Sequence, residues 1–176
     1  QKLSEEKIAL GFYLSGHMFD SYSGEVRRFM KTKLGDLEPS REPRLMAGVI
    51  AALRTQMTQR GKMVIVTLDD GTATVDVTVY NEIYDANKAL FKEDEFLAVH
   101  GKVSEDRFSG GLRITAEKVM DIAACRIQFG KQFAMSSSSS IDPVQIKNIL
   151  SSYRCETGLP FALHYTQQGI GCEIRW

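Results

Sequence analysis

The chain has 176 residues, of which 43% are hydrophobic and 9% aromatic, enough for the core of one medium domain or two small ones. Its 22 basic residues balance 22 acidic ones, so net charge offers no general attraction for a polyanion, and any nucleic-acid surface must be local. The sequence contains no apolar run of about eighteen residues and no signal peptide, so neither a membrane span nor export is predicted.

Cysteine usage and the chain ends point to a reducing compartment and to a fragment. The cysteines Cys125, Cys155 and Cys172 are odd in number and far apart, which is typical of free thiols, so we expect a cytoplasmic protein. The chain begins at Gln1 instead of Met and ends at Trp176, directly after a strand-like run. We therefore expect a piece of a longer polypeptide.

Residues 1–40 predict a helical segment followed by a linker. Ser4 is a plausible N-cap, and the glycines of this segment predict two helical pieces, the second over residues 23–33. Pro39 and Pro43 mark the linker to the next domain, which we expect to span residues 41–122.

Residues 73–80 contain the clearest strand signal, because Val alternates with Thr, Asp and Tyr as a half-buried strand requires. The turn sequence Asp69-Asp70-Gly71 joins this strand to another over residues 63–68 as a hairpin. The apolar run 45–57 is long enough to bend at Gly48 and to serve two parts of a barrel.

A helix and two further strands complete the pattern. Residues 81–91 predict a helix with Asn81 as candidate N-cap, and residues 95–103 and 112–122 predict strands that flank a Ser-Gly-Gly turn. Five strands with a helix between the third and the fourth is the order of the OB fold, a small barrel that binds oligonucleotides. We therefore predict a mixed β and α+β protein with a five-stranded OB-fold barrel, preceded by helices.

Residues 123–176 predict a small, truncated α+β domain. After a short helical run and a serine tract, Pro143 fits the first turn of a helix that ends near Tyr153. Residues 159–166 and 169–176 predict a hairpin that lacks neighbouring strands.

Positive charge gathers in the first hairpin of the predicted barrel. This segment, from Pro43 to Leu68, has no acidic residue and four basic ones, Arg44, Arg54, Arg60 and Lys62, whereas acids cluster in the helix and its exit. Basic side chains that neutralise phosphates release counterions, which makes binding salt-dependent without sequence preference. A solvated basic face explains the pattern equally well.

Binding of single strands also requires flat side chains on which bases stack. Tyr80 lies on the polar face of the Val strand, and Phe108 lies beside Arg107 in a glycine-containing loop. Packing is the alternative for both rings; it weighs as much as function for Tyr80 and slightly less for Phe108.

Catalytic and metal-binding patterns are absent from the sequence. Asp69 and Asp70 resemble paired metal ligands, but they precede a hairpin glycine and no third ligand is near. His17, His100 and His164 are isolated from cysteines and from one another, and we expect His17 to be structural. No phosphate-binding Gly-x-x-x-x-Gly-Lys occurs. We predict no catalytic residue, metal or cofactor in this fragment.

Several stretches resemble one known family. Residues 6–17, Glu-Lys-Ile-Ala-Leu-Gly-Phe-Tyr-Leu-Ser-Gly-His, are similar to the stretch before the OB domain in the alpha subunits of bacterial DNA polymerase III, the family C replicative polymerases. Residues 101–104, 108–112 and 116–122 are similar to the fourth and fifth strands of that OB domain and to the loop that joins them. Met18 departs from the family, which usually has proline after the histidine.

The resemblance implies a C-terminal piece of a DNA-directed DNA polymerase, a nucleotidyltransferase of the bacterial replisome. In that family the catalytic aspartates lie upstream of the residues present here, the OB domain lies near the single-stranded template, and the C-terminal domain contacts the clamp-loader tau subunit. A peptide that binds the sliding clamp lies just before the OB domain. The implied partners are therefore single-stranded DNA, tau and, through the upstream region, the clamp, with no membrane.

Three hypotheses follow for the barrel. In the first, it binds single-stranded template DNA near the polymerase active site, and the candidate residues are Arg54, Arg60, Lys62, Tyr80, Lys102, Arg107, Phe108 and Arg113. In the second, it is a structural docking module with little affinity for DNA and a small salt dependence. In the third, it is a tRNA-binding OB domain of the tRNA synthetase kind, which would prefer structured RNA.

Overall fold

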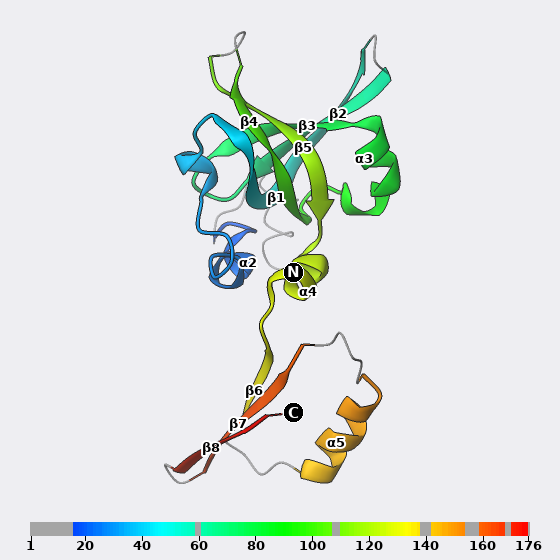
Figure 1. Ribbon diagram of the computed structural model, residues 1–176. Coiled ribbons are helices and arrows are strands. Elements are labelled where there is room, and N and C mark those ends of the chain that lie inside the picture. The colour runs from blue at the N-terminus through cyan, green and yellow to red at the C-terminus, as the bar shows by residue number, and fades with distance from the viewer. Residues whose placement is uncertain are drawn as a thin grey trace. The chain divides into compact units, whose positions relative to one another are not determined.

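The computed structural model describes residues 16–58, 61–106, 110–137, 142–153, 159–167 and 170–175 (Figure 1). The chain divides into two compact units, residues 1–125 and residues 126–176. The first of the two predicted N-terminal helical pieces lies outside the described residues. In the described part of the chain, no helix is both long enough and apolar enough to cross a lipid bilayer.

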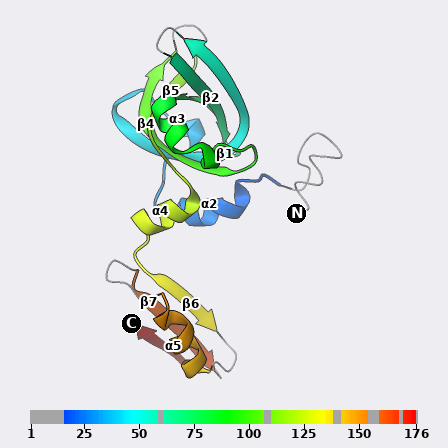
Figure 2. The ribbon, with the colours of Figure 1, turned by 90° about the vertical axis from the view of Figure 1, so that its right-hand side faces the viewer.

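The first unit is built around a closed barrel of five strands with the order β1-β2-β3-β5-β4, seen from the side in Figure 2. The strands are β1 (Ser40–Thr58), β2 (Gly61–Asp69), β3 (Thr74–Tyr80), β4 (Phe96–Glu105) and β5 (Leu112–Met120). β3 and β5 are parallel, and the other neighbours are antiparallel. Helix α3 (Asn81–Ala86) and the 3-10 helix η2 (Lys88–Leu90) join β3 to β4, so the predicted order is confirmed.

β1 serves two sides of the barrel, as predicted. Its first half pairs with β4, and its second half pairs with β2. At Gly48 an added Cβ would lie 2.9 Å from the carbonyl oxygen of Asp69, so only glycine lets the two strands approach this closely. A register shift between Ile50 and Ala52 accompanies the bend.

The barrel core follows the period of two that the sequence predicts for β2 and β3. Val64, Val66 and Leu68 of β2 and Val77 and Val79 of β3 point inward, and each is at most 2% exposed. The residues between them point outward, so the outer surface of these strands is largely polar.

The N-terminal helix α2 (Asp20–Val26) begins and ends earlier than the predicted range 23–33. The Asp20 carboxylate accepts the backbone N–H of His17 at 2.8 Å, which stabilises the helix start. Phe19 stacks on Phe96 of β4, with 6.3 Å between ring centroids. A 3-10 helix, η1 (Leu34–Asp36), then leads into β1.

Two local predictions in the first unit are wrong. Pro43 lies inside β1 and not in a linker; the pairing with β4 is interrupted between Ser40 and Arg44, and a proline, which has no N–H, is tolerated at such an irregularity. Asn81 is not an N-cap, because α3 follows β3 directly, with Tyr80 at the N-cap position and no side chain capping the helix.

The second unit contains a three-stranded sheet in the order β6-β7-β8. Its strands are β6 (Phe133–Ser137), β7 (Phe161–Gln167) and β8 (Ile170–Arg175). Helix α4 (Ile122–Phe129) precedes the sheet, and α5 (Pro143–Ser151) connects β6 to the parallel strand β7. Asp142 caps α5, because its Oδ1 accepts the N–H of Val144 at 2.9 Å. The predicted hairpin therefore has a neighbour, β6, which the sequence did not reveal because its residues are nearly all exposed and show no alternation.

Candidate nucleic-acid interface

Side chains of β1, β2, β3 and β5 that point away from the barrel core share one side of the sheet, which we call the β2–β3 face after its central strands; Thr78 in its middle is 4% exposed. Strand pairing aligns these side chains in neighbouring rows, Arg54-Ile65-Thr78-Thr115 and Ala52-Thr67-Asp76-Arg113. The rows bring together Arg54 and Arg113, two of the predicted binding residues, although 59 positions separate them in sequence.

The carboxylate of Asp76 lies between the two arginines. Its Oδ2 is 2.6 Å from Nη2 of Arg54, and its Oδ1 accepts the hydroxyl of Thr67 at 2.6 Å. Arg113 is the register partner of Asp76 on the parallel strand β5, about 4.8 Å away across the ladder. Asp76 shares the polar side of the Val strand with Tyr80, so the alternation in the sequence already places its carboxylate on this face.

Tyr80 lies further along the same side of β3. It is 40% exposed and stands opposite Met63 of β2. Four residues of extended strand place it about 13 Å from Asp76. An exposed ring at this distance from two guanidinium groups is an arrangement that a single strand can use, with phosphates at one end and a stacked base at the other.

The two other described cations of the prediction already have partners within the protein. Lys62 is on the opposite side of β2 from Met63, and its ammonium lies 5.0 Å from the ring centroid of Tyr84 on α3, so it covers the end of the core. Lys102 on β4 is the register partner of Thr115, so it extends the first row by one strand. Its ammonium lies 3.0 Å from the Glu117 carboxylate, and this pair adds no net charge to the face.

Three predicted binding residues, Arg60, Arg107 and Phe108, lie outside the described residues. The strands that lead to them, β1 with β2 and β4 with β5, reach the same end of the barrel (Figure 1).

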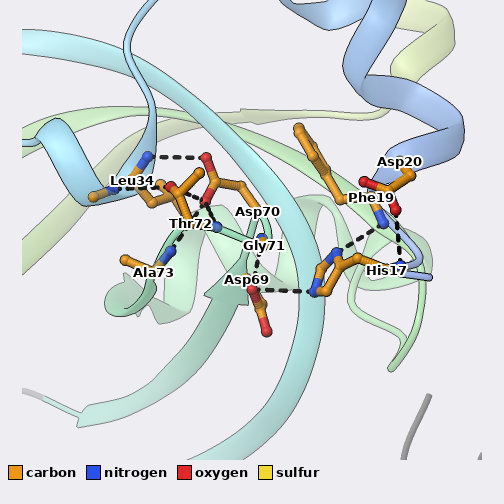
Figure 3. Close-up of polar contacts among 10 residues, drawn as sticks. His17, Phe19, Asp20, Leu34, Asp69, Asp70, Gly71, Thr72 and Ala73 are labelled. Atoms are coloured by element: carbon orange, nitrogen blue, oxygen red, sulfur yellow. Dashed lines mark hydrogen bonds and ion pairs between the residues drawn. The ribbon is translucent and has the colours of Figure 1, made fainter. Parts of the chain in front are cut away.

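The Asp69-Asp70-Gly71 turn contacts the N-terminal segment through both of its carboxylates (Figure 3). Oδ1 of Asp69 accepts the N–H of Gly71 at 2.8 Å and lies 3.1 Å from Nε2 of His17, whose Nδ1 accepts the N–H of Phe19. His17 is thus structural, as predicted. Among the described residues, no group of three or more potential metal ligands occurs.

Asp70 is the buried carboxylate of this turn, 7% exposed. Oδ2 accepts the N–H of Leu34 at 3.0 Å, and Oδ1 accepts the N–H groups of Thr72 and Ala73 and the Thr72 hydroxyl. Burial by itself raises the pKa of Asp70, but the Thr72 hydroxyl and the three backbone donors outweigh it and hold the pKa below its ordinary value of 3.8. Asp70 therefore holds η1 against the barrel as a carboxylate.

Comparison with known proteins agrees with the fold of the barrel. A family model described as an OB-fold nucleic acid binding domain, whose name refers to the tRNA anticodon, matches residues 45–122. DNA polymerase III subunit alpha of Pseudomonas aeruginosa is 39% identical over 77% of this chain and 12% of that protein. The Neisseria meningitidis subunit is 34% identical over 96% of the chain and 15% of the protein, and the Escherichia coli K12 subunit is 32% identical over 99% and 16%.

A solved structure also aligns with the chain, the second OB-fold domain of replication protein A from Methanococcus maripaludis. It shares 21% identity and has a TM-score of 0.42 over 52% of this chain and 93% of that one.

The barrel of the first unit has the OB fold, because its closed strand order agrees with the family model, which is described as a nucleic acid binding domain. The chain as a whole is homologous to one segment of DNA polymerase III subunit alpha, and the resemblance seen in the sequence is confirmed. It spans between 12% and 16% of the length of these relatives.

Proposed function

We propose that the β2–β3 face binds single-stranded DNA, and that the chain is a non-catalytic segment of a replicative DNA polymerase whose template passes this face. The observation that carries the proposal is the convergence of Arg54, Arg113 and the exposed ring of Tyr80 on one accessible surface. Guanidinium groups bind phosphates, and the ring offers a surface to any base, so the expected binding is independent of sequence.

The charges of this face set the expected salt dependence. Two arginines and one carboxylate leave a net charge of one, well below the four cations that the sequence predicted for the first hairpin. If Arg54 and Arg113 each neutralise one phosphate, the logarithm of the association constant falls with that of the salt concentration with a slope of about −1.4. A steep slope would require cations from outside this face.

Fluorescence anisotropy of the 176-residue chain with a labelled single-stranded 20-mer, a duplex and tRNA, each at two salt concentrations, tests the proposal. We expect the single strand to bind most tightly. Tyr80→Ala should weaken binding about fivefold or more, by the loss of one stacked base. Arg113→Ala should weaken binding and make the slope shallower.

Matched controls remove equivalent groups elsewhere. Arg28→Ala deletes an exposed guanidinium near α2, and Tyr153→Ala deletes a ring of the second unit that is 79% exposed. Both should leave the affinity unchanged. Equal binding of all three nucleic acids, or equal effects of controls and face variants, would refute the proposal.

A docking module with little DNA affinity is the second candidate, and the ion pairs of Arg54 and Lys102 favour it, because both cations already have protein carboxylates as partners. It predicts no measurable single-strand binding in the same titration. Preference for tRNA would instead support the third hypothesis, an RNA-binding OB domain.

We further propose, from the family, that the parent chain is a DNA-directed DNA polymerase of the bacterial cytoplasm, with its catalytic aspartates and clamp-binding peptide upstream. In this proposal the second unit contributes to contact with the tau subunit. Calorimetric titration of the chain with tau, before and after removal of residues 126–176, tests the assignment: heat that survives the truncation contradicts it.

A further inference from the structure

The carboxylate of Asp76 occupies the position at which a phosphate would meet Arg54. Carboxylate and phosphate oxygens bind a guanidinium in the same forked geometry, and the contact of 2.6 Å between Oδ2 and Nη2 is already that of a strong charged pair. A DNA strand on this face must therefore replace the Asp76 carboxylate by a phosphate as the partner of Arg54.

Asp76 has a second partner on the face besides Arg54. The Thr67 hydroxyl on β2 donates to its Oδ1 at 2.6 Å, and this bond does not involve the arginine. Arg113, its register partner on β5, flanks it on the other side. A phosphate bound between the arginines would consequently lie next to a fixed negative charge.

The fold itself does not need this carboxylate. The side chain of Asp76 is 48% exposed and that of Arg54 is 62% exposed, and ion pairs with such exposure contribute little to stability. Aspartate is also among the residues least suited to a strand interior. Asp76 is therefore a residue that the strand disfavours, yet Arg54 and Thr67 hold it in the middle of the proposed binding face. We look for its role in binding and not in stability.

We propose that Asp76 is an internal competitor for phosphate, which keeps the affinity of the β2–β3 face for single-stranded DNA low. This inference rests on the proposed function of the face and names the residue that limits it. A face of low affinity releases the backbone readily, as a surface over which a template strand moves must do.

Asp76→Asn tests the competitor. The amide keeps the shape and can still accept the Thr67 hydroxyl, but it carries no charge. We expect the variant to bind the single-stranded 20-mer about two- to fivefold more tightly than the unmodified chain, the range set by an exposed ion pair. The salt slope should become steeper by about 0.7 for each phosphate newly neutralised. Asp76→Thr, which suits a strand better, should show the same gain and guards against misfolding of the first variant.

Glu93→Gln is the matched control, since it removes one exposed carboxylate from the turn before β4 and so changes the net charge equally. The double variant Arg54→Ala/Asp76→Asn tests whether Asp76 acts through Arg54. Without Arg54, the increase in single-strand affinity caused by Asp76→Asn should be smaller. Unchanged or weaker binding by both Asp76 variants, while the unmodified chain binds, overturns this inference and leaves the proposed function intact. An equal gain in Glu93→Gln also overturns it. If neither the unmodified chain nor any variant binds, both proposals fail.

Discussion

Replacing Asp70 by alanine should weaken the attachment of the N-terminal segment to the barrel. In the structure this carboxylate accepts the backbone N–H groups of Leu34, Thr72 and Ala73 as well as the Thr72 hydroxyl. Leu34 lies on η1, outside the barrel sequence, so one buried side chain joins a turn between two strands to a segment 36 positions earlier in the chain. Alanine leaves those donors without an acceptor.

The cost is set by the charged hydrogen bonds. Each is worth about 1.5–3 kcal/mol, but they share two oxygens and water can reach the Thr72 side of the turn, so we expect about 3 kcal/mol of lost unfolding free energy for Asp70→Ala. A loss of that size lowers the melting temperature by about 10 °C. Asp36→Ala, which removes an exposed carboxylate from η1, is the control and should change the unfolding free energy by less than about 0.5 kcal/mol.

The effect should depend on pH in one direction. Because the folded-state pKa of Asp70 lies below its ordinary value of 3.8, the carboxylate stabilises the fold fully above that value, and the stabilisation is lost as the pH falls through the lower, folded-state pKa. The difference between the unmodified chain and Asp70→Ala should therefore be constant from about pH 7 to about pH 5 and shrink towards about pH 3. Urea unfolding followed by circular dichroism measures it. A difference below about 1 kcal/mol at neutral pH, or one that grows on acidification, would refute the reasoning.

Two further predictions concern the first unit. Burial, reinforced by nearby Asp121, raises the pKa of Cys125 to about 11. Alkylation of this thiol at about pH 8, followed by peptide mass spectrometry, should therefore be roughly a hundredfold slower in the native than in the unfolded chain. Equal rates would contradict the burial of Cys125. Gly101→Ala should lower the free energy of unfolding by about 2 kcal/mol or more, because the new Cβ collides with the carbonyl oxygen of Thr115. Gly24→Ala in α2 meets nothing within 4 Å and should raise the free energy of unfolding by up to about 1 kcal/mol. Thermal unfolding measures both, and similar effects of the two variants would contradict the packing.

The barrel could be predicted from the sequence because its signals are local. The alternation of Val with polar residues in β3, the turn at Gly71 and the bend at Gly48 each depend on a few neighbouring residues, and together they determine the strand order. β6 escaped prediction for the opposite reason. Its exposed residues carry no periodic pattern, and it is a strand only because β7 lies beside it in register.

The β2–β3 face was only partly predictable, because the distribution of charge along the chain does not show which charges lie side by side across the strands. The segment from Pro43 to Leu68 lacks acids, but its neighbour β3 supplies Asp76 to Arg54, and α3 supplies the ring of Tyr84 to Lys62. Identifying Asp76 and Tyr84 as these partners requires the strand register and the side of the strand on which each residue lies. Both become known only once the strands are paired.

This cross-strand pairing changes what the face can do. A patch of unpaired cations would attract a phosphate backbone and hold it. Two arginines around a fixed carboxylate would instead exchange that carboxylate for a phosphate, with a small net gain in binding free energy. In the proposed binding mode, the stacking of bases on Tyr80 would contribute as much as the phosphates, and salt would weaken binding less than the composition of the hairpin suggests. Under the proposal, the charge of Asp76 would therefore determine whether this surface holds a single strand tightly or lets it move.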